Sequence, residues 1–170
     1  MNLITLLKED HKEVEDLFKR IEATSPRAMK TRQKLFLQIK AALTVHSAAE
    51  EELLYPRMKE MRELRHDAFL ANEEHRLVKQ LLDELSNLDA AEEQWDAKMS
   101  VLMDMVRHHV REEEGEYFKA LKLEMNRAEL MQLGEEVQAF KERFEMPRET
   151  QQQESRPSPS PMNSGQELHA

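Results

Sequence analysis

The sequence contains no cysteine and only three glycines, and it has no long apolar run. Without cysteine, disulfides, thiolate-bound zinc, iron–sulfur clusters and thiol catalysis are excluded, so any metal site must use histidine, carboxylate or tyrosine. The scarcity of glycine argues against phosphate-binding loops and glycine-rich β-sandwiches. No apolar stretch approaches the roughly 18 residues that cross a bilayer, and the N-terminus lacks the basic start and apolar core of a secretory signal. We therefore expect a cytoplasmic protein that does not enter membranes.

Acidic residues outnumber basic ones. The 170 residues carry a net charge of −9, and 35% of them are charged. Binding to nucleic acid requires a basic face that neutralises phosphates, so this chain is not expected to be a general nucleic-acid binder. Together with an apolar content of 39%, the composition favours long, solvated helices around one modest core.

Apolar residues recur at intervals of three and four from Leu3 to about Arg143, which is the period of amphipathic helices. The pattern predicts five helices, over residues 3–21, 26–61, 66–86, 90–123 and 126–146. Four long helices with short connections favour an all-α, up-down-up-down four-helix bundle, with the short fifth helix packed on its side. We expect this domain to occupy residues 1–146.

Local signals set the expected helix boundaries. Ser25 followed by Pro26 predicts the start of the second helix, and Pro56 predicts a kink or an early end near its last turns. Two pairs, Asp89 with Glu92 and Asn126 with Glu129, have the spacing of capping boxes. After Pro147 the chain becomes rich in Pro, Ser and Gln, so we expect residues 147–170 to form a disordered tail.

Each of the four long helices places one histidine in its apolar stripe. These histidines are His11, His46, His75 and His109. Glu50 follows His46 by four residues and Glu113 follows His109 by four, so each glutamate shares a helix face with its histidine. A lone buried glutamate would cost several kcal/mol in lost hydration, and a cation in the same seam removes that cost. Inward-facing His and Glu side chains are the donors of dinuclear sites in helical bundles.

The same arrangement occurs twice along the chain. Residues 9–14 resemble residues 73–78, and His46-x-x-x-Glu50 resembles His109-x-x-x-Glu113. Each helical hairpin therefore supplies one histidine and one His-x-x-x-Glu pair. We interpret this as two half-sites, one metal ion per hairpin, with the two glutamates as bridges.

Other interpretations apply to single residues. One histidine in an apolar stripe is more often a core residue than a ligand, but four of them, two with a following glutamate, favour a metal site. His66, His108 and His169 are expected outside it. The other glutamates near the site are expected on solvated faces; they are Glu51, Glu52, Glu112, Glu114 and Glu116. The alternative for Glu51 and Glu114 is to hold the ligands in place by hydrogen bonds. Tyr117 is expected to pack in the core, and Trp95 to anchor it.

Taken in order, four motifs resemble the hemerythrin-like HHE cation-binding family over roughly residues 3–143. The motifs are Leu6-Leu7-Lys8-Glu9-Asp10-His11, His46-x-x-x-Glu50-Glu51 with Tyr55-Pro56, Glu74-His75, and His109-x-x-x-Glu113-Glu114-Gly115-Glu116. The resemblance implies a four-helix bundle that holds a non-haem di-iron centre, that is, two iron ions with a bridging oxygen species. It implies six ligands: His11, His46, Glu50, His75, His109 and Glu113.

The sequence departs from the oxygen-carrying members of this family at one point. Those proteins place two histidines four residues apart on the third helix, whereas Ala71 and Lys79 occupy these positions around His75. Two six-coordinate irons offer about twelve positions. Four histidines, two bridging glutamates and a bridging oxygen fill about ten of them. About two positions remain open, so clean reversible oxygen carriage is in doubt.

The resulting prediction is a protein that binds or senses oxygen, nitric oxide, peroxide or iron through a core His/Glu site. Its expected partner is a small diatomic molecule or peroxide. Two alternatives stay open: a small di-iron peroxidase or catalase-like enzyme, and a helical interaction module that the metal only stabilises.

Overall fold

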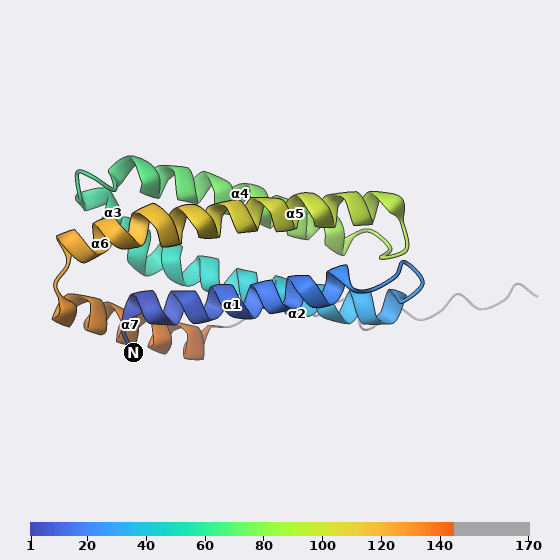
Figure 1. The fold of residues 1–170 in the computed structure, drawn as a ribbon, viewed down its shortest axis with the longest axis horizontal. Helices are drawn as coiled ribbons and strands as arrows, with labels where there is room; N and C mark the ends of the chain where they lie inside the picture. Colours follow the sequence, from blue (N-terminus) through green and yellow to red (C-terminus); the bar gives the residue numbers. More distant parts are fainter. Residues whose placement is uncertain (145–170) are drawn as a thin grey trace, which may run out of the picture.

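The computed structural model describes residues 1–144, and every regular element within them is helical (Figure 1). The elements are α1 (Leu3–Glu22), α2 (Met29–Ala49), η1 (Glu50–Leu54), α3 (Tyr55–Glu60), α4 (Arg65–Ser86), α5 (Glu93–Glu112), η2 (Glu113–Tyr117), α6 (Phe118–Glu124) and α7 (Arg127–Arg143). Here η1 and η2 are single wide turns of π-helix.

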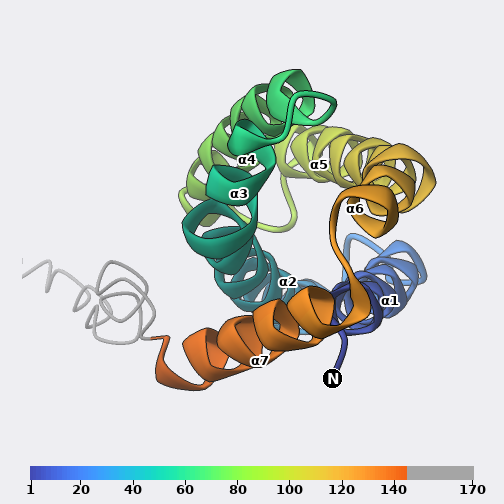
Figure 2. The same ribbon diagram turned by 90° about the vertical axis from the view of Figure 1, so that its left-hand side faces the viewer.

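Four rods enclose the core. The segments α2, η1 and α3 form one continuous rod, and α5, η2 and α6 form another, while α1 and α4 complete the bundle. The end-on view shows these rods arranged around a common axis, with α7 crossing the outside of α1 and α2 (Figure 2). The predicted all-α, up-down-up-down bundle with an added fifth helix is confirmed.

Two apolar clusters fill the bundle, one toward each end. The first includes Leu7 and Tyr55, and the second includes Val14 and Trp95, which is fully buried as expected. Along α1, His11 lies between Leu7 and Val14, so a polar layer separates the two clusters. That layer contains the candidate site.

Two boundary predictions for the second helix need correction. Ser25 and Pro26 lie in a turn, in which the Ala28 amide donates to the Ser25 carbonyl, and α2 begins only at Met29 without a side-chain cap. Pro56 does not end the rod. The wide turn η1 precedes it, so Pro56 falls in the first turn of α3, where its missing N–H costs nothing.

The capping predictions have different outcomes. Asn126 and Glu129 form the predicted box at the start of α7, which ends at Arg143. The Glu92 side chain accepts from the Asp89 amide as expected, but the Asp89 side chain accepts from the Ala91 amide, so no full capping box forms. Both bonds lie in a turn, and α5 begins at Glu93 rather than near Ala90. The predicted tail, residues 147–170, lies outside the described residues.

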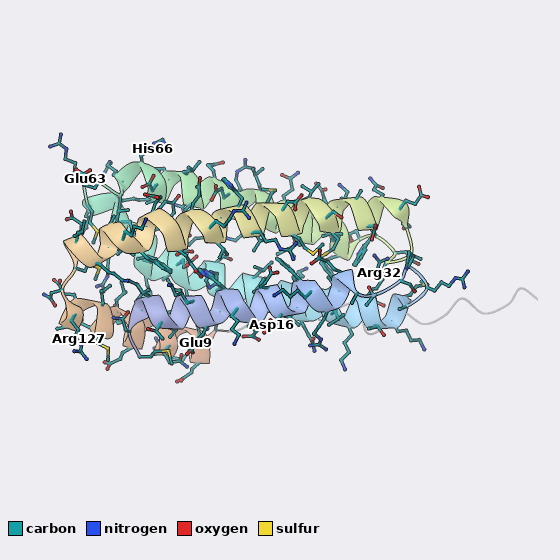
Figure 3. The ribbon with its side chains drawn as sticks, in the orientation of Figure 1. Glu9, Asp16, Arg32, Glu63, His66 and Arg127 are labelled. Atoms are coloured by element: carbon teal, nitrogen blue, oxygen red, sulfur yellow. The ribbon has the colours of Figure 1, made fainter. Side chains whose placement is uncertain are left out.

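A buried arginine, Arg32, lies at the end of the bundle opposite to Arg127 (Figure 3). Arg32 donates to the Ala90 carbonyl at 2.9 Å, pairs with Asp96 and lies over the Trp95 ring at 4.7 Å. These contacts satisfy its charge in an apolar setting and join α2 to α5.

In the described part of the chain, no helix is both long enough and apolar enough to span a bilayer.

Gly134 allows α7 to approach the N-terminus, and Gly134→Ala is expected to destabilise the bundle. A Cβ there would lie 2.1 Å from the Met1 carbonyl oxygen and 2.7 Å from the Leu3 nitrogen, both backbone atoms. Overpacking of this kind costs about 1–3 kcal/mol. Gly115→Ala is the matched control, since a Cβ at Gly115 meets nothing within 4 Å and is expected to be neutral or slightly stabilising. Urea unfolding measures both; equal stabilities would contradict the prediction.

Candidate metal centre

The structure brings the six predicted site residues into one buried layer. The histidines come from α1, α2, α4 and α5, and the glutamates are the first residues of η1 and η2. Both glutamates are fully buried, and each histidine is at most 6% exposed. The layer consists of His11, His46, Glu50, His75, His109 and Glu113.

The first half-site belongs to the hairpin of α1 and α2. The Nε2 atom of His11 lies 3.2 Å from Oε2 of Glu113, and Nε2 of His46 lies 3.3 Å from Oε1 of Glu50. One donor atom from each of these four residues lies within 4.8 Å of the others. Two imidazoles and two carboxylates therefore face a single point.

The second half-site belongs to the hairpin of α4 and α5. The Nε2 atoms of His75 and His109 are 3.2 Å apart. Oε2 of Glu50 lies 3.4 Å from His75, and Oε2 of Glu113 lies 3.6 Å from His109. Glu50 thus directs one oxygen to each half-site, as a bridging carboxylate does.

Each histidine is oriented from outside the layer by a carboxylate at its Nδ1 atom. Glu114 accepts from His11 at 2.8 Å and Glu51 accepts from His75 at 3.0 Å. Sequence reasoning named both glutamates as candidates. A proton on Nδ1 leaves the Nε2 lone pair free to bind a metal.

Two further orienting carboxylates were missed. Asp10 accepts from Nδ1 of His46 at 3.2 Å, and Glu74 accepts from Nδ1 of His109 at 2.5 Å. Each precedes a layer histidine in the sequence but serves the histidine of the neighbouring helix. The sequence repeat pointed to these two residues, because an acidic residue precedes both His11 and His75.

The π-turns place one more polar group in the layer. In η1 the Tyr55 amide bonds to the Glu50 carbonyl, five residues back, so these two residues share a face. The Tyr55 hydroxyl donates to Oε2 of Glu50 at 3.0 Å and lies 3.1 Å from Nε2 of His75 and 3.4 Å from Nε2 of His109. It occupies the centre of the second half-site.

The first half-site has no equivalent hydroxyl. Phe118 stands at the position of Tyr55 in the second π-turn, and its ring stacks on His11 with centroids 6.2 Å apart. The two half-sites therefore differ in donors, although the sequence repeat suggests that they are alike. Sequence reasoning missed Tyr55, because a spacing of five residues does not share a face in an ordinary α-helix.

The remaining candidates lie where expected. His66 is exposed at one end of the molecule (Figure 3) and the side chain of His108 is 55% exposed, so both are outside the layer. Tyr117 packs in the first apolar cluster. His169 lies outside the described residues.

Several buried polar atoms of the layer have no hydrogen-bond partner within the described residues. They are Nε2 of His11, Oε1 of Glu50 and both carboxylate oxygens of Glu113. Buried polar atoms are otherwise almost always bonded. Unpartnered oxygens and an imidazole nitrogen that face one another form a donor set for a cation, so these residues fit a bound metal.

Residues 2–121 match the family model described as the hemerythrin HHE cation binding domain. The chain belongs to this family. The resemblance read from its four motifs is thereby confirmed, and the buried His/Glu layer is the part of the HHE domain suited to bind a cation.

One solved structure supports the same assignment, and a curated protein is also similar in sequence. The crystal structure of a hemerythrin HHE cation binding domain-containing protein from Mycobacterium kansasii is similar with a TM-score of 0.72 and 26% identity, over 84% of this chain and 86% of that one. A protein described as a DNA nickase from Nostoc sp. is 29% identical over 146 residues. The match covers 85% of this chain but 40% of the Nostoc protein, so this HHE chain spans less than half of that relative's length.

Electrostatics of the HHE layer also favour a cation. Burial raises the pKa of Glu50, and the nearby charge of Glu113 raises it further. Burial acts in the same direction on Glu113, but the nearby His11 ring, 3.2 Å away, and the charge of His109 outweigh it and lower its pKa. Without a cation, therefore, burial and Glu113 disfavour the charge on Glu50, and the charge on Glu113 depends on the neighbouring histidines.

The histidines differ in their protonation. Burial lowers the pKa of His46 and lowers that of His75 to about 4, so both rings are neutral near pH 7. Burial also acts to lower the pKa of His11, but bonding to Glu113 and Glu114 overrides it and raises the value. The raised pKa favours a proton on the His11 ring. A metal ion that binds His11 must displace this proton, so metal uptake is expected to release protons.

His75 is expected to make the metal-free protein sensitive to acid. Its pKa is about 4 in the folded chain and 6.5 in an unperturbed histidine, so the unfolded chain binds more protons between these values. The neutral ring therefore contributes fully to the free energy of unfolding above pH 6.5. This contribution, up to about 3 kcal/mol, is lost as the pH falls toward 4. Urea unfolding at several pH values should show a shallower loss for His75→Gln; parallel curves would contradict this.

Proposed function

We propose that the chain binds two iron ions in its buried His/Glu layer and uses them to bind or sense a small molecule. The observation that carries this proposal is the pair of fully buried glutamates with unpartnered oxygens. Taking a carboxylate out of water costs several kcal/mol unless a counter-charge is present. Four Nε2 atoms and a shared carboxylate supply the remaining donors for two cations.

The donor types support iron. The layer offers imidazole nitrogens and carboxylate oxygens without sulfur, a set that suits iron, manganese or zinc. Membership of the HHE family and the resemblance to di-iron proteins favour iron among these. Held in this layer, iron supplies a reversible one-electron change and an open coordination position. The four outer carboxylates keep each imidazole in the tautomer that binds.

The space beside the layer limits what can bind. A cavity of about 30 Å³ is lined by the four histidines, Ser47, Glu74 and apolar side chains. The apolar lining residues are Val14, Leu43, Val78, Val106 and Val110. A volume of this size suits a water or a molecule of two heavy atoms. Oxygen, nitric oxide and peroxide fit this description.

The nicking activity in the name of the Nostoc relative has no comparable support here. A phosphodiester is too large for the cavity and is repelled by a chain of net charge −9. Within the described residues, the two core glutamates are not reachable by such a substrate because both are fully buried.

Metal content and the visible spectrum test the proposal. Protein purified without oxygen is expected to hold about two irons per chain and to gain a near-ultraviolet band when air, nitric oxide or peroxide is admitted. A chelator should lower the melting temperature, because metal bound only to the folded state stabilises it. One zinc or no metal, with no spectral response and an unchanged melting temperature, would leave a helical interaction module as the better account.

The Tyr55 hydroxyl favours a second candidate, turnover of peroxide. The sequence offered no buried acid or base besides the ligands, whereas the structure places this hydroxyl against Glu50, His75 and His109. Burial and the charge of Glu50 raise the pKa of Tyr55, so it retains its proton near pH 7. Peroxide turnover by the iron-loaded protein that is lost in His75→Ala would select this candidate over binding alone.

A further inference from the structure

A second group of possible metal donors lies on the surface of the bundle, outside the buried layer. It consists of Glu74 from α4 and His108 and Glu112 from α5, with one donor atom from each within 4.8 Å of the others. Nε2 of His108 lies 3.3 Å from Oε1 of Glu112 and 3.9 Å from Oε1 of Glu74. The His108 side chain is 55% exposed, so solvent reaches the group directly.

Glu74 connects this surface group to the interior. Its Oε1 atom faces His108, while its Oε2 atom accepts a hydrogen bond from Nδ1 of His109, a residue of the second half-site. Glu74 also lines the cavity beside the four core histidines. One carboxylate therefore contacts both the surface group and the buried layer.

Charge favours this face for an arriving cation. The groove between α1 and α5 also reaches His11, but Lys8, Lys12 and Arg111 line it, and no ion pair joins these three to a carboxylate in the described part of the chain. The surface group itself contains two carboxylates, those of Glu74 and Glu112. Burial and then the charges of Glu74, Asp67 and Glu112 raise the pKa of Tyr117, which shows that these carboxylates act on one region.

We propose that Glu74, His108 and Glu112 bind a divalent cation at the surface and pass it inward to the buried layer. One imidazole and two carboxylates suit Fe²⁺, Mn²⁺, Co²⁺ or Zn²⁺, and three protein donors leave positions for water. Exposure and open positions favour weak, exchangeable binding, as a loading site requires. The surface site stands by itself, whereas its loading role rests on the proposed function of the layer.

Mn²⁺ tests the surface site. After the buried layer has been filled with iron under anaerobic conditions, free Mn²⁺ is followed by its magnetic resonance signal during titration. The wild-type chain is expected to bind about one additional Mn²⁺. The variant with His108→Ala and Glu112→Gln is expected to lose affinity by at least about tenfold. If the wild type and the double variant bind Mn²⁺ with the same affinity, the proposed surface site is wrong.

Co²⁺ tests the loading role. Metal-free protein is mixed with Co²⁺, and the visible absorption of histidine-bound cobalt is followed in time. After desalting to remove weakly held surface cobalt, the same double variant is expected to have filled the buried layer about tenfold more slowly but to the same final absorbance. The matched control combines Glu63→Gln with His66→Ala, which makes the same chemical change at exposed positions at one end of the molecule (Figure 3), and should fill at the wild-type rate.

The outcomes separate the two proposals. Filling of the double variant at the wild-type rate, with Mn²⁺ binding lost, would overturn the loading role and leave the buried centre intact. If none of the three proteins develops the absorption of histidine-bound cobalt, the buried centre itself fails and the loading role fails with it, while the Mn²⁺ titration still decides whether the surface site exists.

Discussion

Glu113→Gln is expected to remove the internal metal ions while leaving the helices folded. Oε2 of Glu113 lies 3.2 Å from Nε2 of His11 and 3.6 Å from Nε2 of His109, so one carboxylate serves both half-sites. The amide has the same shape but lacks the charge that balances a cation. We expect metal affinity to fall by at least about 100-fold, measured as metal content after dialysis and by competition with a chelator.

The metal-free form shows whether the effect arises from the site or from folding. At pH 8 the metal-free variant should keep the helix content of the wild type, with an equal or lower urea midpoint, because it loses the contact with His11 that lowers the pKa of Glu113. Glu116→Gln is the matched control: the same chemical change on the same π-turn, at an exposed position. Two retained ions in Glu113→Gln, or equal losses in Glu116→Gln, would contradict the assignment.

Helical periodicity was sufficient to predict which side chains meet in the core. His46 and Glu50 share a helix face, as do His109 and Glu113, and four amphipathic helices can bury their stripes only against one another. The four separate histidines must therefore meet in one layer. From the sequence, Glu51 and Glu114 were expected first on solvated faces and only second as partners of the ligands, because a hydrogen bond between helices depends on their register.

Contacts between helices were harder to predict than contacts within one. Asp10 serves His46 across the first hairpin, and Glu74 serves His109 across the second, a pairing that depends on helix register. The sequence repeat shows that an acidic residue precedes each of two histidines, but only the structure shows which histidine that residue contacts. Within each half, an equivalent hydrogen bond joins the two helices, which explains why an acidic residue precedes both His11 and His75.

The π-turns were the other feature beyond prediction from the sequence. An α-helical register would bring the residue four positions after each glutamate, Leu54 or Tyr117, to the same face. The wide turn instead brings the residue five positions on, which is Tyr55 in one half and Phe118 in the other. This shift changes the donor count that the sequence implied, because Tyr55 stands among the donors of the second half-site.

Tyr55→Phe is expected to weaken binding of one metal ion and not the other. The hydroxyl lies within 3.0–3.4 Å of donor atoms of Glu50, His75 and His109, all in the second half-site. Loss of the hydroxyl should lower the metal affinity of the second half-site by about 10–100-fold. The first half-site, which has Phe118 in place of a tyrosine, should keep its metal ion. If the chain turns over peroxide, we expect the rate to fall by about 100-fold or more.

Tyr117→Phe provides the control, because Tyr117 is also buried but its hydroxyl has no hydrogen-bond partner within the described residues. Both variants keep their rings, and Phe118 shows that phenylalanine is accommodated at the equivalent turn. Metal titration followed by the visible spectrum should therefore show two unequal binding steps in Tyr55→Phe and unchanged binding in Tyr117→Phe. Equal weakening of both steps in Tyr55→Phe would mean that the hydroxyl acts through Glu50, which spans both half-sites, and not on the second alone.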